Sequence, residues 1–458
     1  MIRRLLVLTA LLCAFGAAPA EASTGCGRFD DGELRVGIIS GADAVGIVRS
    51  GEGIVVTVNG APITCQGTAP TVRNTDTIAL SDISTAPNQV TIDLSGGAFA
   101  PGATAELGSN DEIEFDVFLS GPDVETLQLH GGPAADSLRL GQSAGSGGVN
   151  LNAGSESGPA IGTDVDLTFG GVDFVVVDGG PGDDSVDAGG GAEFAGAVAR
   201  TVLLTGAAGN DRLRGGDASD RITDGPGDDV VAGGDGGDTF DQTGDTGDDT
   251  IAGGAGVDAV GYGVMAAAPT RVDLRLTGTQ DTGSNGRDAL SGIEDLATGE
   301  GADVVIGDDA SNFLGARGGD DVVIGGGGAL DQIDGGAGTD TLSYATATEG
   351  VNVDLAHGSP AVEHTGGGGD DRFAGFENLT GSSAADNQLA GTHEPNTIIG
   401  LGGTDTVDAR GGADVLEIRD GEADGAVCGD GADTVIADVS GVDFLAADCE
   451  GRRFDVRP

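Results

Sequence analysis

The sequence has few of the large side chains from which globular cores are built. Aromatic residues make up 3% of its 458 residues, tryptophan is absent, and tyrosine occurs only twice. The hydrophobic 38% is mostly Ala, Val, Leu and Ile, which suit a thin core repeated along an axis. Helical periodicity of any length is absent. The composition therefore predicts an all-β solenoid, although the length alone would allow two or three compact domains.

Lysine is absent too. All 21 basic residues are arginine, against 75 acidic residues, so the net charge is −54. Without a basic patch, nucleic acids and anionic membranes are poor partners. The excess carboxylates need counter-ions, and hard divalent cations prefer oxygen ligands. Salt adaptation or an acidic disordered tail is the alternative, but neither would place aspartates in phase with glycines.

Long apolar runs are confined to the N-terminus. Arg3 and Arg4 precede the apolar run Leu5–Phe15, and Ala20-Glu21-Ala22 is a small-x-small cleavage motif. Residues 1–22 are therefore predicted to be a cleaved signal peptide, with Sec export favoured over the twin-arginine route. No later stretch is apolar enough to span a membrane. We expect a secreted, extracellular protein with no integral membrane segment after cleavage.

Four cysteines remain in the expected mature chain. They are Cys26, Cys65, Cys428 and Cys449, and in an exported protein an even number suggests disulfides. Three pairings are possible, and zinc binding is an alternative that the scattered histidines do not favour. Because two cysteines lie near each end, we predict Cys26–Cys65 and Cys428–Cys449, which would oppose fraying of the end coils.

Glycine, by contrast, is abundant, with 88 residues. Between Gly206 and Gly261 it recurs in nonapeptides that open with glycines and have an aspartate sixth and a large apolar residue eighth. The sixth residues are Asp211, Asp220, Asp229, Asp238, Asp249 and Asp258, and the eighth are Leu213, Ile222, Val231, Phe240, Ile251 and Val260.

Further copies flank this array. Earlier nonapeptides contain Asp136 and Asp184. A second array has its sixth residues at Asp303, Asn312, Asp321, Asp331 and Asp340, and a third at Asn387, Asn396, Asp405, Asp414, Asp424 and Asp433. Breaks at 262–297 and 344–382 precede these two arrays. Because the breaks and arrays align with each other, the C-terminal half contains an internal duplication.

The repeat has a physical reading. Glycine turns let main-chain carbonyl groups converge on an ion, and the aspartate adds a short carboxylate there. One inward apolar residue per nine contributes only about 2 kcal/mol, which is less than the conformational entropy lost on ordering nine residues. Like carboxylates in stacked coils also repel one another. The sequence therefore predicts that bound divalent cations supply much of the folding free energy.

The arrays resemble the RTX, or haemolysin-type, calcium-binding repeats of bacterial secreted proteins. The breaks are similar to segments that this family carries between arrays, seen here in Ser343-Tyr344-Ala345, Val351–Leu355 and Phe376–Leu379. The resemblance implies a right-handed parallel β-roll (β-helix) solenoid. It also implies that sixth-position aspartates and turn carbonyls bind several Ca²⁺ ions, with weaker or empty sites at Asn312, Asn387 and Asn396.

The ligands predicted in this way are Asp184, Asp211, Asp220, Asp229, Asp238, Asp249, Asp258, Asp303, Asp321, Asp331, Asp340, Asp405, Asp414 and Asp433. The expected organisation is a small N-terminal β cap (23–95), an irregular β-solenoid (96–200), a first array (201–261), two segments of linking strands and array (262–343 and 344–427), and a C-terminal disulfide cap (428–458).

Signatures of catalysis are weak. Gly141-Gln142-Ser143-Ala144-Gly145 matches the nucleophile-elbow pattern, but the glycines that follow do not favour the helix that such an elbow needs. The favoured interpretation is a calcium-stabilised extracellular or cell-surface structural module without a catalytic domain, with contact to an extracellular polymer left open. The alternatives are a polysaccharide-processing β-helix enzyme of lyase or epimerase type, with its groove within 96–200, and an adhesin.

Overall fold

The computed structural model describes residues 24–28, 32–38, 43–82, 86–97, 113–119, 123–143, 146–151, 166–190, 194–263, 268–328, 330–357, 363–364, 369–386, 388–439 and 442–454. The predicted signal peptide lies outside these residues. The chain forms two compact units. The first comprises residues 1–240 with 253–256, and the second comprises residues 241–252 with 257–458.

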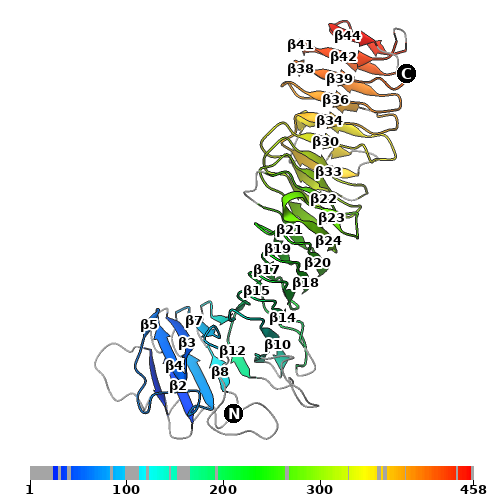
Figure 1. The fold of residues 1–458 in the computed structure, drawn as a ribbon. Helices are drawn as coiled ribbons and strands as arrows, with labels where there is room; N and C mark the ends of the chain where they lie inside the picture. The colour runs from blue at the N-terminus through cyan, green and yellow to red at the C-terminus, as the bar shows by residue number, and fades with distance from the viewer. Residues whose placement is uncertain are drawn as a thin grey trace. The chain divides into compact units, whose positions relative to one another are not determined.

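The described chain is all-β, with short strands joined by turns (Figure 1). The strands up to the end of the first unit are β1 Gly25–Arg28, β2 Glu33–Ile38, β3 Ala44–Ser50, β4 Gly53–Val58, β5 Ala61–Pro62, β6 Thr77–Asp82, β7 Gln89–Asp93, β8 Glu114–Phe118, β9 Thr126–His130, β10 Ser137–Ser143, β11 Ser146–Asn150, β12 Leu167–Gly170, β13 Phe174–Asp178, β14 Ser185–Asp187, β15 Val202–Thr205, β16 Arg212–Arg214, β17 Arg221–Thr223, β18 Val230–Asp235 and β19 Thr239–Asp241.

In the first unit, most strands belong to two sheets of mainly parallel strands, as expected for a β-roll, with antiparallel pairs where β1 joins β2, where β4 and β5 follow β3, and where β11 lies between β10 and β12. One sheet contains β2, β6 and β8 in order, followed by β12, and later β10, β14, β16 and β18. The other contains β3, β7, β9, β13, β15, β17 and β19. The parallel ladders thus begin at β2 and β3, within the segment 23–95 for which a small cap is predicted.

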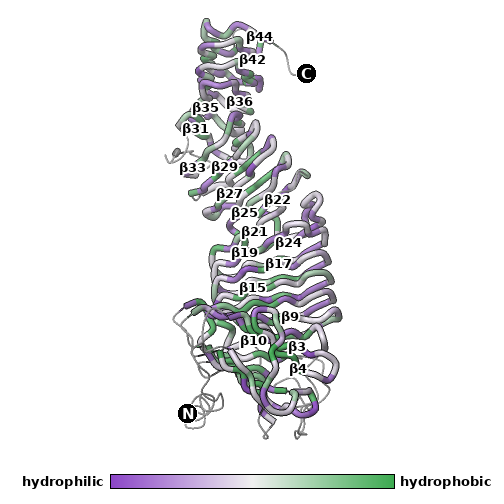
Figure 2. The backbone as a smooth tube through the Cα atoms, turned by 90° about the vertical axis from the view of Figure 1, so that its left-hand side faces the viewer, coloured by the Kyte–Doolittle hydropathy of each residue, from purple (hydrophilic) through white to green (hydrophobic). Residues whose placement is uncertain are grey.

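The repeat length sets the coil length in the array. Leu204 pairs with Ile222 and Leu213 pairs with Val231, so two nonapeptides make one coil. The eighth-position residues of the array are buried, from Leu213 at 2% exposed to Phe240 at 0%. This confirms the inward position predicted for them. Hydrophobic and hydrophilic residues accordingly alternate along the coils (Figure 2).

The remaining strands, most of them in the second unit, are β20 Thr250–Ala255, β21 Ala259–Gly261, β22 Arg271–Asp273, β23 Gln280–Asp281, β24 Arg287–Ser291, β25 Asp295–Ala297, β26 Val304–Ile306, β27 Phe313–Gly315, β28 Val322–Ile324, β29 Gln332–Asp334, β30 Thr341–Ser343, β31 Asn352–Asp354, β32 Glu363–His364, β33 Asp370–Ala374, β34 Asn378–Thr380, β35 Gln388–Ala390, β36 Thr397–Ile399, β37 Thr406–Asp408, β38 Gly411–Gly412, β39 Val415–Glu417, β40 Gly425–Val427, β41 Asp430–Gly431, β42 Thr434–Ala437, β43 Phe444–Leu445 and β44 Gly451–Phe454. Two 3₁₀ turns, η1 Gly283–Asn285 and η2 Leu355–His357, lie in the breaks.

Parallel stacking continues in the second unit. One ladder runs β22, β26, β28, β30, β34, β36, β39, β42 and β44. A second runs β21, β25, β27, β29 and β33, and a third runs β31, β35, β37, β40 and β43. The duplication is visible in these ladders, since β22 and β31 lie within the two breaks and each starts a ladder.

Both predicted disulfides are confirmed. Cys26, at the start of the described chain, bonds Cys65, and Cys428, which follows β40, bonds Cys449 shortly before β44. Within the described residues, no helix is long and apolar enough to cross a membrane.

Candidate calcium centre

The sixth-position aspartates link neighbouring coils through one carboxylate oxygen. Oδ1 of Asp229 accepts the main-chain N–H of Asp211 at 2.5 Å, and Oδ1 of Asp238 accepts that of Asp220 at 2.8 Å. In the second unit, Oδ1 of Asp340 accepts the N–H of Asp321 at 2.8 Å in the same way. All fourteen aspartates predicted as ligands are buried, none more than 3% exposed.

The other oxygen, Oδ2, is left without a hydrogen-bond donor in many of these repeats. Among the described residues this holds for Asp184, Asp211, Asp321, Asp340, Asp414, Asp424 and Asp433. A buried carboxylate oxygen without a donor is costly. A proton or a cation is needed to offset that cost.

The first glycine of the repeat keeps the space beside Oδ2 clear. A Cβ built on Gly206 would clash with Oδ2 of Asp211 and would lie 2.5 Å from the carbonyl oxygen of Asp224 in the next coil. On Gly179 it would lie 2.7 Å from Oδ2 of Asp184. The space therefore faces a carboxylate oxygen and a carbonyl oxygen. That donor set fits a hard, oxygen-preferring cation such as Ca²⁺.

The backbone conformation of the second residue of the repeat correlates with whether Oδ2 receives a main-chain donor. In most repeats with an open Oδ2 this residue has a positive φ, as in Gly180, Ala207, Arg317, Gly336, Arg410 and Gly429. In three repeats with a closed Oδ2, the second residue does not have a positive φ and its N–H donates to that oxygen. The pairs are Gly132 with Asp136 at 2.6 Å, Gly216 with Asp220 at 2.6 Å, and Ser382 with Asp386 at 2.9 Å. A left-handed turn residue is thus associated with an open oxygen.

Burial also changes the acidity of these groups. Desolvation raises the pKa of Asp184 and Asp321 to about 6, and that of Asp220, Asp405 and Asp424 to about 7. Neighbouring carboxylates add to the rise, while hydrogen bonds from main-chain N–H groups oppose it. Without a cation, part of this ladder therefore holds protons near neutral pH.

Sequence reasoning missed several buried carboxylates, Asp288 and Asp371 among them. Asp288 and Asp371, both 0% exposed, lie in the breaks and accept the main-chain N–H of Asp249 and Asp331 through Oδ1, as repeat aspartates do. The partners are 39 and 40 residues apart in sequence. A nine-residue period therefore does not predict the positions of Asp288 and Asp371. The equivalence of Asp288 and Asp371 in the duplication could have been a signal.

The register of the third array also differs by one residue at its start. Asn387 lies outside the described residues. Its neighbour Asp386 is 1% exposed and donates its N–H to Oδ1 of Asp405 at 3.0 Å, as a sixth-position residue does. The inward apolar residue of this repeat is Leu389. The spacing between Asp386 and Leu389 is one residue longer than in the regular repeat, which explains why a fixed period points to position 387.

The described residues of the elbow-like pattern, Gly141, Gln142 and Ser143, lie in β10. Ser143 ends β10 and pairs with Ser146 at the start of β11, so the serine belongs to an antiparallel hairpin. A nucleophile elbow needs a strand followed by a helix.

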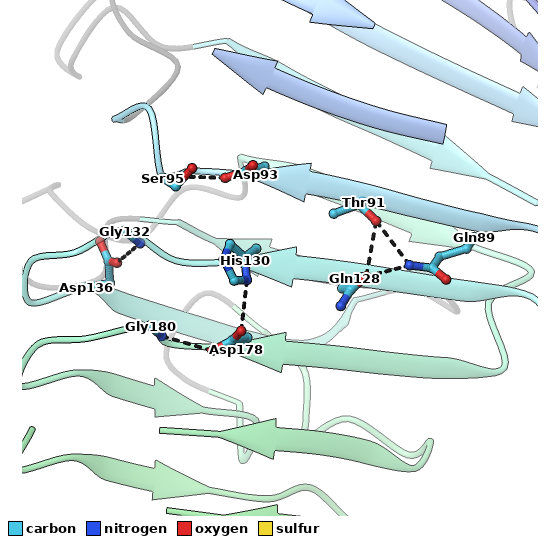
Figure 3. Close-up of polar contacts among 10 residues, drawn as sticks. All are labelled: Gln89, Thr91, Asp93, Ser95, Gln128, His130, Gly132, Asp136, Asp178 and Gly180. Carbon is cyan, nitrogen blue, oxygen red and sulfur yellow. Dashed lines mark hydrogen bonds and ion pairs between the residues drawn. The ribbon is translucent and has the colours of Figure 1, made fainter. Parts of the chain in front are cut away.

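Polar side chains elsewhere in the first unit bond to one another on β7, β9 and β13 (Figure 3). Thr91 donates to Gln128 at 3.2 Å, and Nδ1 of His130 lies 2.9 Å from Oδ2 of Asp178. Oδ1 of Asp178 caps the following turn by accepting the N–H of Gly180 at 3.1 Å. These side chains therefore link neighbouring inner strands of the sheet and stabilise the turn after β13.

The fold is thus that of a parallel β-roll repeat protein with a buried carboxylate in turn after turn. The family model described as RTX calcium-binding nonapeptide repeat (4 copies) matches residues 205–240, 243–263, 297–329, 316–342 and 382–416. The chain therefore carries RTX calcium-binding repeats. A search of curated proteins found no match. The coils before residue 205 repeat the same carboxylate contacts outside the matched segments, since Asp136 donates its N–H to Oδ1 of Asp184 at 2.6 Å.

Proposed function

We propose that the protein is a secreted, calcium-stabilised structural module without a catalytic domain, acting outside the cell or at its surface. The observation that carries this proposal is the ladder of buried Oδ2 atoms that lack a donor and face turn carbonyls. The disulfides at both ends support an oxidising compartment. An acidic repeat structure suits contact with extracellular polymers through shared cations.

The calcium ligands are proposed residue by residue. Positions with an open Oδ2, such as Asp211 and Asp340, would bind most tightly, together with the carbonyl oxygens that face them. Asp220 would bind more weakly, because both of its oxygens already accept main-chain hydrogen bonds, from Val202 and Gly216. At each site the ion would neutralise carboxylates in stacked coils, which otherwise repel by roughly 3 kcal/mol per pair at an effective dielectric constant of 20.

The test compares the mature chain with saturating calcium and after calcium has been removed. We expect a β-rich circular dichroism spectrum and a compact sedimenting species with calcium, and an expanded, largely disordered chain without it, because the binding free energy is part of the folding free energy. Magnesium at the same concentration is the control, since its smaller, octahedral coordination suits these sites poorly. A chain that binds no calcium and keeps its structure would contradict the proposal.

A further inference from the structure

The two breaks between arrays contain the only two tyrosines of the chain, Tyr262 and Tyr344. Both are buried, at 0% and 2% exposed. The hydroxyl of Tyr262 donates to Oδ2 of Asp288 at 2.9 Å, and that of Tyr344 donates to Oδ2 of Asp371 at 3.1 Å. In the regular repeats this is the oxygen that faces the open space beside the first glycine. At the breaks, this oxygen instead accepts a hydrogen bond from the tyrosine hydroxyl.

An asparagine makes a second contact of this kind in the array that follows each break. Oδ1 of Asn312 accepts the N–H of Asp308 at 2.9 Å, and its Nδ2 donates to the carbonyl oxygen of Glu294 at 2.7 Å. Asn396 is equivalent, since its Nδ2 donates to the carbonyl oxygen of Glu377 at 2.5 Å. An aspartate at either position would place a carboxylate oxygen against a carbonyl oxygen. The amide satisfies that carbonyl without an ion.

Those two carbonyl groups are available to the asparagines because the N–H that would normally bond to each of them bonds to a side-chain oxygen instead. In a regular coil, the N–H of the seventh residue bonds to the main-chain carbonyl of the sixth residue in the coil before, as from Val322 to Asp303 at 2.9 Å. At the breaks, the N–H of Phe313 bonds to Oδ1 of Asp295, and that of Thr397 bonds to Oδ1 of Asn378, each at 2.8 Å.

A glutamate completes each set. Oε2 of Glu294 accepts the N–H of Asp258 at 2.9 Å, and Oε2 of Glu377 accepts the N–H of Asp340 at 2.9 Å. The glutamate thus does what a sixth-position aspartate does elsewhere. The same four contacts recur in the two copies of the duplication. A chance arrangement in one copy would not explain this recurrence.

We propose that these two sets of contacts are calcium-independent joints between the calcium-dependent arrays. The first joint is made by the side chains of Tyr262, Asp288, Glu294, Asp295 and Asn312 with their main-chain partners, and the second by those of Tyr344, Asp371, Glu377, Asn378 and Asn396 with theirs. Tyrosine and asparagine close positions where the regular repeat is open to an ion. The joints stay ordered when calcium is removed, and they divide the second unit into segments that refold separately when calcium returns. The proposal rests on calcium binding by the arrays.

Hydrogen–deuterium exchange of the calcium-free mature chain, freed of the ion by dialysis, tests this. In the wild-type chain, the amides of Asp249, Asp331 and Thr397 are expected to exchange at least ten times more slowly than those of Asp211 and Asp321. Tyr344→Phe removes one hydroxyl and keeps the ring. It is expected to speed exchange at the second joint at least tenfold without lowering the calcium bound per chain at saturation. Asn396→Asp is expected to loosen the same joint in calcium-free solution.

Asp321→Asn is the matched control. It removes an open repeat carboxylate, so it should lower the calcium bound per chain while leaving exchange at the second joint of the calcium-free chain unchanged. Joint amides that exchange as fast as array amides in the wild-type chain, or unchanged exchange in both Tyr344→Phe and Asn396→Asp, would overturn the proposal. A wild-type chain that binds no calcium would contradict the proposed function instead, because the exchange comparison is made without the ion.

Discussion

At the scale of single residues, the second position of the repeat carries backbone strain. Ala207, Arg317, Leu401 and Arg410 hold positive φ values of 76°, 66°, 74° and 70° there, a region that side chains with a Cβ seldom adopt. Such a conformation costs about 1–2 kcal/mol per residue. At Ala207, Arg317 and Arg410 this conformation accompanies an Oδ2 atom of the same repeat that lacks a donor.

Ala207→Gly is therefore expected to stabilise the calcium-loaded first unit by about 0.5–1 kcal/mol, since relief of strain exceeds the extra entropy of glycine in the unfolded chain. Gly225→Ala is the reverse change at the same position one coil on, with φ at 95°, and its Cβ would clash with the carbonyl oxygen of Ala207. It should destabilise. Urea denaturation in saturating calcium measures both. Equal midpoints for the two variants would show that the turn carries no strain.

At the scale of structural elements, the end coils depend on covalent closure. Cys428 and Cys449, 0% and 2% exposed, tie the turn after β40 to the approach to β44 across a sequence separation of 21. The terminal ladder strand β44 has a neighbour, β42, on only one side among the described strands. Its residues are exposed, from Gly451 to Phe454. Side-chain burial therefore contributes little to holding β44 in place.

Replacing Cys428 and Cys449 together by alanine is expected to lower the unfolding free energy by about 3 kcal/mol in the chain-entropy account. The loss should be confined to the last coil, so exchange should rise in β43 and β44 before it rises in β22 or β26. Hydrogen exchange in calcium locates the change. The Cys26→Ala/Cys65→Ala pair is the control, because its effect should appear at β1 and β2 and leave β44 unchanged.

At the scale of the whole molecule, the carboxylate ladder makes stability depend on pH in opposite ways with and without calcium. In the folded, calcium-free chain the pKa of Asp220, Asp331, Asp405 and Asp424 is about 7, and that of Asp184 and Asp321 is about 6, because burial disfavours the charged form. The unfolded values lie near 3.8. The folded state thus binds more protons between these values.

It follows that the calcium-free chain should be most ordered near pH 4 and should lose stability progressively as the pH rises to about 7. With calcium the trend should reverse, since protons compete with the ion for the same carboxylates. Denaturation midpoints between pH 4 and 8, on protein freed of calcium by dialysis and on the calcium-loaded protein, check both directions. Stability that rises with pH in the calcium-free chain would show that these carboxylates are not buried as described.

Much of this architecture could be predicted because it depends on local periodicity. A nine-residue period with one apolar residue correctly placed Leu213, Phe240 and their equivalents inside the coils, and the positions of the cysteines near the two ends were enough to predict both disulfides. Every predicted ligand is buried, from Asp184 to Asp433. Local pattern succeeds here because each coil contacts mainly its neighbours.

The sequence by itself therefore determined the all-β repeat, its inward apolar residues and the positions of its carboxylates. Only the tertiary structure decided which carboxylates are left open. The backbone conformation at Gly216 and Ser382 closes Asp220 and Asp386, and tyrosines 26 and 27 residues away close Asp288 and Asp371. The physical reason is that a hydrogen bond to a buried oxygen depends on which N–H or O–H the neighbouring coil brings within reach, and residue types at fixed spacing do not specify that.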